Sequence, residues 1–358
     1  MRNFLLVSIG LAAAVLAQTG AAADRAHVAL NRLSSIPIPG QPLKSFDISA
    51  VSEAQHVLAF SDRSNHAVDF VDTRTDRFAG RALGFSSGGP NGVVAVGDGE
   101  FWAGDGGSKL RVVDAHTRRI VATISTGGKK RVDEVAYDPR EQVVIAANND
   151  DDPPFVTFVS TAPGHRIVGK LSFPQATDGL EQPVWNPVDG MVYLSIPVLN
   201  HRKADGGIAV IDPRTQRLMD TIHVSQCMPA GLALGPNDQL LVGCSDDAVA
   251  EGFAPRSLIL DLGERKLVTE IRQVGGSDEV WYDSSSGRYY LAAVANPHGP
   301  VLGVVDARKD TWLVNLPTGA RAHSVAADAS SGKVFVPVAA NSTVKGCTNG
   351  CVEVFGGE

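Results

Sequence analysis

The sequence repeats one pattern seven times, and this repetition limits the folds open to the chain more than any other feature. In its clearest copy, Asp278-Glu279-Val280-Trp281-Tyr282-Asp283 is followed by Gly287-Arg288-Tyr289-Tyr290-Leu291. Each copy opens on a polar residue, continues as an apolar strand, turns, and returns as a second apolar strand. A fixed period of this kind indicates a repeat architecture.

The spacing of the opening residues indicates the fold class. Successive openings are 44, 42, 48, 49, 48 and 45 residues apart, at Asp47, Asn91, Asp133, Glu181, Ala230, Asp278 and His323. A period of about 40–50 residues is typical of the four-stranded blades of a β-propeller. We therefore predict an all-β chain that folds into seven blades.

The two ends of the chain predict how the ring closes. The unit that starts at Glu181 contains four expected strands, at residues 183–185, 191–196, 207–212 and 217–222. The last unit has only three, and residues 30–40 resemble a fourth. We expect this N-terminal strand to complete the last blade, because closure removes open sheet edges. Residues 24–358 would then form a single domain.

The first 23 residues have the pattern of a secretory signal peptide. Arg2 precedes an apolar run at residues 4–17, and Ala21-Ala22-Ala23 offers a cleavage site before Asp24. The run is short for a membrane span, and no later stretch is apolar for long enough. We expect a periplasmic or secreted protein with no membrane span after cleavage.

The charge balance disfavours nucleic acid as a partner. Formal net charge is −7 for the whole chain. Without residues 1–23 it is −8, from 31 basic and 39 acidic residues. The one basic cluster, Lys129-Lys130-Arg131, is expected to be a solvated loop, whereas phosphate binding needs clustered basic residues.

The four cysteines predict two disulfides. Cys227 and Cys244 bracket a predicted hairpin, and Cys347 and Cys351 bracket a tight loop. An even cysteine count in an exported chain favours disulfides. Metal ligation is disfavoured because no Cys-x-x-Cys pair or Cys/His cluster is present.

The opening residues are the candidate functional site, because in a propeller they converge on one end of the central channel. Four of them are acidic, and like charges at ~4 Å repel by about 1–4 kcal/mol per pair. Water, raised pKa values or a cation must relieve this repulsion. Oxygen ligands suit Ca²⁺, which we favour, and His323 makes Zn²⁺, Mn²⁺ or Fe²⁺ compatible as well. A hydrated polar channel without a ligand is the alternative.

Roles can be assigned to particular residues on this hypothesis. The expected metal ligands are Glu181, Asp278, Asp133, Asn91 and His323. His323 or Asp133 would move the proton. The expected substrate pocket comprises Asp47, Asn149, His201, Asn296 and Asn341. A register shift of one residue would turn Glu134, Gln182 and Glu279 inward instead.

Two family resemblances bear on these expectations. Residues 108–127, Ser-Lys-Leu-Arg-Val-Val-Asp through Thr-Ile-Ser-Thr-Gly, resemble the repeat of the YVTN (YncE-like) seven-bladed propellers. Residues 180–193, around Glu181, are similar to the glutamate-bearing repeat of the SMP-30/gluconolactonase propellers. That resemblance implies a divalent metal in the channel, although Ala230 stands where the second family has a ligand Asn.

These patterns predict an exported enzyme that uses a divalent metal in the channel to act on a small molecule. Hydrolase or lactonase chemistry is the nearest analogue, and lyase or isomerase chemistry is also compatible. The alternative function is a non-catalytic YVTN-type propeller that binds a partner protein, a metal or a ligand.

Overall fold

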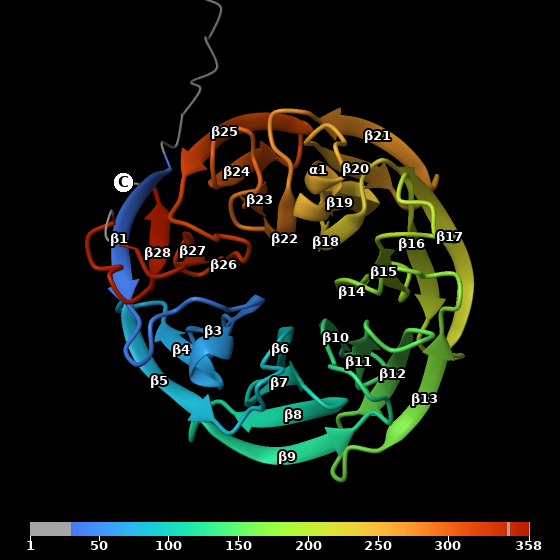
Figure 1. Ribbon diagram of the computed structural model, residues 1–358, viewed down its shortest axis with the longest axis horizontal. Helices are drawn as coiled ribbons and strands as arrows, with labels where there is room; N and C mark the ends of the chain where they lie inside the picture. The colour runs from blue at the N-terminus through green and yellow to red at the C-terminus, as the bar shows by residue number, and fades with distance from the viewer. Residues whose placement is uncertain (1–29, 342–343, 358) are drawn as a thin grey trace, which may run out of the picture.

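Seven antiparallel sheets of four strands surround a central axis (Figure 1). The computed structural model describes residues 30–341 and 344–357. In each sheet the first strand lies nearest the axis and the fourth lies at the rim. The prediction of a seven-bladed β-propeller is confirmed. The predicted signal peptide, residues 1–23, lies outside the described residues.

The first four blades follow the chain from its N-terminal half. Blade 1 consists of β2 (Ser49–Ser52), β3 (Val57–Asp62), β4 (Ala67–Asp72) and β5 (Arg77–Leu83). Blade 2 consists of β6 (Val93–Val96), β7 (Glu100–Asp105), β8 (Lys109–Asp114) and β9 (Arg119–Ser125). Blade 3 consists of β10 (Val135–Asp138), β11 (Val143–Asn148), β12 (Phe155–Ser160) and β13 (Ile167–Ser172). Blade 4 consists of β14 (Pro183–Trp185), β15 (Val192–Ile196), β16 (Asp205–Asp212) and β17 (Arg217–Ser225).

The remaining blades complete the ring. Blade 5 consists of β18 (Pro229–Leu234), β19 (Gln239–Cys244), β20 (Ser257–Asp261) and β21 (Lys266–Ile271). Blade 6 consists of β22 (Ser277–Asp283), β23 (Arg288–Ala293), β24 (Val301–Asp306) and β25 (Thr311–Pro317). Blade 7 contains β26 (Ala326–Asp328), β27 (Lys333–Val338), β28 (Cys351–Gly356) and β1 (Asn31–Pro37). Three short helices lie in loops: η1 (Arg63–Asn65), η2 (Pro236–Asp238) and α1 (Asp246–Ala250).

Blade 7 closes the ring with strands from both ends of the described chain. Its order is β1-β28-β27-β26, and β1 pairs antiparallel with β28 from Asn31–Gly356 to Pro37–Cys351. The predicted closure by an N-terminal strand is confirmed. Blade 7 packs against blade 6 on one face and against blade 1 on the other. Its fourth strand is paired in the same way as the fourth strands of the other blades.

Burial follows the position of each strand in its blade. The second strand of blade 1, β3, is buried at five of its six positions, because both of its faces pack against other blades. The rim strand β9 alternates between exposed and half-buried residues, as expected for a strand with one solvated face. At the interface of blades 1 and 2, the fully buried rings of Phe70 and Phe101 meet edge to face at 5.6 Å.

Backbone bonds between neighbouring blades join the inner ends of the blades. Gly92 N–H donates to Asp133 O at 2.8 Å, and Glu279 N–H donates to His323 O at 2.9 Å. A Cβ on Gly92 would lie 2.5 Å from Asp133 O, so this close approach requires glycine. The opening residues of adjacent blades are thus held in a defined order around the channel.

Both predicted disulfides are present. Cys227 and Cys244 have Cα atoms 4.5 Å apart, and Cys347 and Cys351 have Cα atoms 4.8 Å apart. Within residues 30–341 and 344–357, no helix has the length and apolar character needed to cross a membrane.

Candidate functional site

The opening residues of the blades meet at one end of the channel, as predicted. A cavity of about 340 Å³ at this channel mouth is lined by Asp47, Asp133, Glu181, Asp278 and His323, among others. We refer to it as the mouth cavity. Each of these residues lies two or three residues before a first strand or, for Asp278, near its start, so the repeat itself brings them together.

Arg63 neutralises one part of this ring. It begins η1, directly after β3, and its guanidinium forms an ion pair with Asp47. Its Nε and Nη2 donate to Asn91 Oδ1 at 3.0 and 2.8 Å. Nη2 also lies 3.9 Å from Asp133 Oδ1. Burial alone would raise the pKa of Asp47, but Arg63 and His323 outweigh burial and lower it.

Arg131 neutralises the next member of the ring. Its Nη2 lies 2.9 Å from Asp133 Oδ2, and its Nε donates to Asn149 Oδ1 at 3.3 Å. Asn149 Nδ2 donates to Asp133 as well. Burial still raises the pKa of Asp133 to about 7, against the effect of Arg131. The prediction that residues 129–131 form a solvated loop is therefore wrong for Arg131, because its side chain pairs with the carboxylate of Asp133.

His323 lies between the two carboxylates that flank it in the ring. Its Nε2 donates to Phe46 O at 3.1 Å and lies 3.7 Å from Asp47 Oδ1, while its ring stacks on Phe46 at 4.8 Å. Burial lowers the pKa of His323, but Asp47 and Asp278 outweigh this effect and raise it. One ligand atom each from Asp47, Asp278 and His323 lie within 4.8 Å of one another.

Glu181 and Asp278, the remaining carboxylates of the ring, have no arginine partner among the described residues. Burial raises the pKa of Glu181 well above its usual range and raises that of Asp278 to about 6. Asp246 and Asp247, from α1, face the same space. Among the described residues, none of these four carboxylates forms a salt bridge. We call Glu181, Asp246, Asp247 and Asp278 the acidic side, and Asp47, Asn91 and Asp133 with their two arginines the arginine side.

A cleft of about 610 Å³ adjoins the mouth cavity beside the acidic side. The two cavities share Arg131, Glu181, Asp246, Asp247 and Asp278. Among the described residues, Arg131 is the only arginine or lysine that lines the cleft. The carboxylates that line it are Asp150, Asp151, Asp152, Asp178, Glu181, Asp246, Asp247 and Asp278. The cleft therefore favours cationic ligands over anionic ones.

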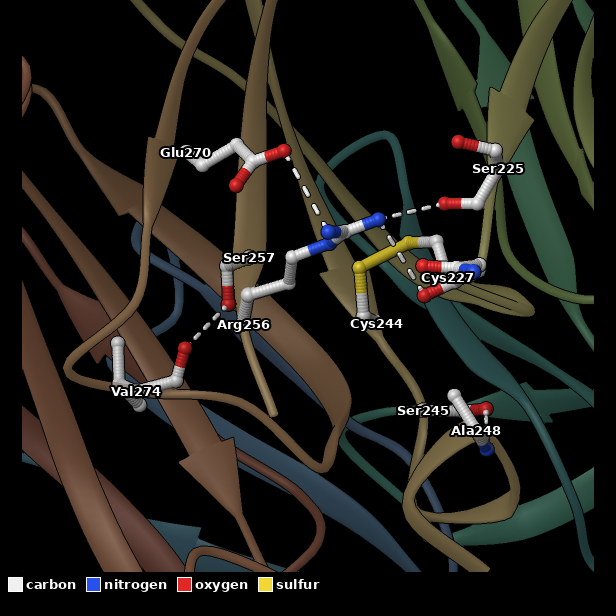
Figure 2. The surroundings of a disulfide bond; sticks show 10 residues. Ser225, Cys227, Cys244, Ser245, Ala248, Arg256, Ser257, Glu270 and Val274 are labelled. Atoms are coloured by element: carbon white, nitrogen blue, oxygen red, sulfur yellow. Dashed lines mark hydrogen bonds and ion pairs between the residues drawn. A yellow bond between two sulfur atoms is a disulfide. The ribbon is translucent and has the colours of Figure 1, made fainter. Parts of the chain in front are cut away.

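The Cys227–Cys244 disulfide positions the acidic helix of the cleft (Figure 2). Cys244 ends β19, and Ser245 follows as the N-cap of α1, accepting a bond from Ala248 N–H at 3.2 Å. Ser245 N–H donates to Cys227 O at 3.2 Å. Because the disulfide fixes the residue before this cap, it also fixes where Asp246 enters the cleft.

The predicted site residues divide into three groups. The mouth cavity holds Asp47, Asp133, Glu181, Asp278 and His323. The arginines hold Asn91 and Asn149, and Asn149 and His201 line the cleft. Neither Asn296 nor Asn341 is among the described residues that line the mouth cavity or the cleft.

Sequence reasoning missed Arg63, and it misjudged Arg131. Both lie at positions that the repeat brings to the mouth, Arg63 after a second strand and Arg131 two residues before an opening residue.

The structure also gives the register of the first strands, which shows whether the opening residue or the one after it lines the mouth cavity. The next residues along the first strands, Gln182 and Glu279, line a separate cavity of about 360 Å³ with the apolar first-strand residues, whereas Glu134 reaches the mouth cavity.

Comparison with known proteins identifies the fold and no closer relationship. No protein-family model matches the sequence, and no curated protein matches it. A chain from the structure titled Kuenenia stuttgartiensis hydrazine synthase has a TM-score of 0.70 and 14% identity, over 88% of this chain and 96% of that one. A chain from the crystal structure of the mitotic checkpoint complex has a TM-score of 0.69 and 13% identity, over 99% of both chains. These similarities show that the chain has the fold of a seven-bladed β-propeller.

Proposed function

We propose that the protein is an exported enzyme that binds a divalent metal ion at the channel mouth and acts on a small molecule in the adjoining cleft. The observation that carries this proposal is the convergence of Asp47, Asp278 and His323, whose ligand atoms lie within 4.8 Å of one another. The two disulfides are consistent with an oxidising compartment outside the cytoplasm.

The donor set fits a transition metal better than Ca²⁺. Two carboxylates and one imidazole suit Zn²⁺, Mn²⁺ or Fe²⁺, and three protein ligands would leave positions for water or substrate. Ca²⁺ takes about 6–8 oxygen ligands. Two of the oxygen donors expected from the sequence, Asn91 and Asp133, are already bonded to arginines. Asp47 also pairs with Arg63, but through Oδ2, and its Oδ1 lies on the side of His323. Glu181 is also outside the group of three.

The surrounding residues would orient and protonate the substrate. A bound divalent ion would polarise a carbonyl or activate a water molecule. The Phe46 carbonyl holds the imidazole of His323 in place, and Arg63 holds Asp47. Asp133, with its pKa raised to about 7 by burial, can accept and return a proton near neutral pH. His201 and Asn149 line the path from the cleft.

One observation favours the second candidate, a non-catalytic propeller that binds a ligand or a partner protein. Arg63, Arg131 and a protonated His323 together supply the positive charge that Asp47 and Asp133 need. The ring on that side is then stable without a metal, and the acidic cleft alone would be the binding surface.

Metal analysis of the purified protein separates the two candidates. We expect Zn²⁺, Mn²⁺ or Fe²⁺ to co-purify, and to be lost in Asp278→Asn and His323→Gln. Glu181→Gln should retain the metal, because its carboxylate is outside the group of three. Asp98→Asn, an exposed change, is the matched control. If no divalent metal binds, and the two ligand variants keep wild-type thermal stability with added Mn²⁺, Zn²⁺ or Ca²⁺, the non-catalytic candidate stands.

A further inference from the structure

The residue that directly follows the opening residue of a blade can accept a hydrogen bond from the next blade. In blade 4, Gln182 Oε1 accepts from Leu232 N–H of blade 5 at 2.8 Å. In blade 6, Glu279 Oε2 accepts from Val325 N–H of blade 7 at 2.9 Å. A buried polar side chain at this position is therefore bonded by the backbone of its neighbour, as buried acceptors require.

Blade 3 breaks this rule. Glu134 occupies the same position and is 5% exposed, but the residue of blade 4 that should donate to it is Pro183. Proline has no N–H. No other described residue donates a hydrogen bond to this carboxylate. Without this donor, the carboxylate depends on the contents of the cavity for its hydrogen bonds, because a polar group in a largely buried side chain needs partners.

The unpartnered carboxylate faces the mouth cavity. Glu134 lines that cavity together with Glu181 and Asp278. On its other flank lies Gly92 of blade 2, where a Cβ would come within 3.1 Å of Glu134 Oε2. Neither neighbouring blade fills the space in front of the carboxylate, so it remains open to a ligand in the cavity.

The arginines of the cavity are engaged elsewhere, and Lys44, which also lines the cavity, is exposed and donates no hydrogen bond to Glu134. Arg63 and Arg131 pair with Asp47 and Asp133. Arg321 donates to the backbone carbonyl of Lys44 at 2.9 Å. Beyond the cavity, the cleft adds further carboxylates and no other lysine or arginine. The group that Glu134 lacks is a positively charged hydrogen-bond donor that enters from outside.

We propose that Glu134 and Glu181 bind an ammonium group of a small organic diamine, whose second ammonium group lies in the acidic cleft. This inference rests on the proposed function, because it assigns a substrate class to the same channel mouth. An ammonium group offers three donors that can reach separate acceptors. A metal ion needs its ligands closer together, and Glu134 is not part of the group within 4.8 Å. The cavities, about 340 and 610 Å³, have the size of small-ligand sites.

Two variants remove the proposed contact in different ways. Glu134→Gln removes the ionisable carboxyl group. Pro183→Val leaves every charge in place but supplies the missing backbone N–H, so that Glu134 becomes bonded internally as Glu279 is. Val occupies the equivalent position in blades 6 and 7, at Val280 and Val325. Glu53→Gln, an exposed change on blade 1, is the control for net charge.

Isothermal titration calorimetry with diaminobutane, in the presence of a chelator, tests the proposal. We expect the purified protein and the Glu53→Gln control to bind diaminobutane and not butanediol. Glu134→Gln and Pro183→Val should each bind about tenfold more weakly or worse, the loss expected for one charged hydrogen bond. Thermal unfolding should show both variants folded, with Pro183→Val no less stable than wild type.

The proposal is overturned if the wild-type protein does not bind diaminobutane, or if either variant binds it as tightly as wild type. Binding of butanediol at equal strength overturns it too. Because the chelator removes metal, a positive result stands even if the metal proposal fails. Metal binding without amine binding would overturn this inference and leave the metal proposal in place.

Discussion

The two sides of the channel mouth are built from equivalent positions of one repeat, yet their electrostatics are opposite. On the arginine side, Asp47 and Asp133 lie against Arg63 and Arg131. On the acidic side, Glu181 and its neighbours have no basic partner of this kind among the described residues. Repeat position decides where a carboxylate lies, whereas nearby loop residues decide whether its charge is balanced.

This difference separates stability from ligand binding. Carboxylate oxygens that pair with the half-buried arginines contribute to the stability of the ring and are not free to bind a ligand. Asp47 pairs with Arg63 through Oδ2 and leaves Oδ1 on the side of His323. Carboxylates left close together with raised pKa values cost stability and are typical of functional sites. We therefore assign ligand binding to the acidic side and to the adjoining group of Asp47, Asp278 and His323.

The largest expected effect comes from breaking the arginine side. Arg63→Met would leave the buried carboxylate of Asp47 unpaired and remove two bonds to Asn91. We expect a loss of about 3 kcal/mol in the free energy of unfolding, measured by urea denaturation. The matched change on the acidic side, Glu181→Gln, should cost nothing or stabilise the protein. Equal losses in the two variants would contradict the comparison.

An effect of similar size is expected from the disulfide that positions the acidic helix. Replacing Cys227 and Cys244 by Ser opens a link across 17 residues, which should cost about 3 kcal/mol. The same change at Cys347 and Cys351, a separation of 4, should cost about 2 kcal/mol on the same chain-entropy relation. Urea unfolding of the two double variants measures both. A larger loss from the shorter link would show that chain entropy does not govern this pair.

Glu279 predicts a pH-dependent effect of intermediate size. Burial raises its pKa to about 8, although Ser324, Val325 and Ser49 donate to the carboxylate. The unfolded chain releases this proton near pH 4.3, so the native state is progressively destabilised as pH rises from there to about 8. Glu279→Gln should therefore match wild type near pH 4 and be more stable above pH 8, by about 2 kcal/mol. Urea unfolding in chelator across this pH range is the measurement, and parallel pH profiles for the two proteins would show that Glu279 ionises normally.

The smallest effect is expected at the exposed rim of the acidic side. Asp247→Asn removes a carboxylate whose pKa is raised by partial burial and by Asp246 and Asp178. Because the residue is exposed, we expect a stabilisation of only a few tenths of a kcal/mol at low salt. Thermal unfolding should show this gain disappear at high salt, where surface charges are screened. A gain that persists at high salt would mean that packing, and not repulsion, is responsible.

Much of the fold was predictable because each copy of the repeat contains local sequence patterns that indicate strands and turns. The four strands of blade 4, the fourth strand of blade 7 at residues 31–37, and both disulfides follow from apolar runs, turn residues and cysteine spacing, although β16 begins two residues earlier and β17 ends three residues later than expected. Five ring residues at the mouth were also predictable, since a fixed period places equivalent positions at one radius and one height.

The partners of those residues were not predictable. Arg63 and Arg131 reach the ring from loops of different blades, and nothing in the local sequence sets the direction of a long side chain in a loop. Likewise, Asn296 and Asn341 have the same position in the repeat as pocket residues, but the cavities do not extend to them.

The sequence by itself determined the number of blades, the closure of the ring and the set of carboxylates that converge on the channel. These depend on periodicity and on strand pairing, which are local or regularly repeated. Only the tertiary structure decided which carboxylates are neutralised and which are left open. The charge of Asp133 is balanced by Arg131, whose side chain turns towards it, and the open state of Glu134 depends on a proline in the next blade. The first depends on the direction of a long side chain in a loop, and the second on two neighbouring blades that meet only when the chain has folded.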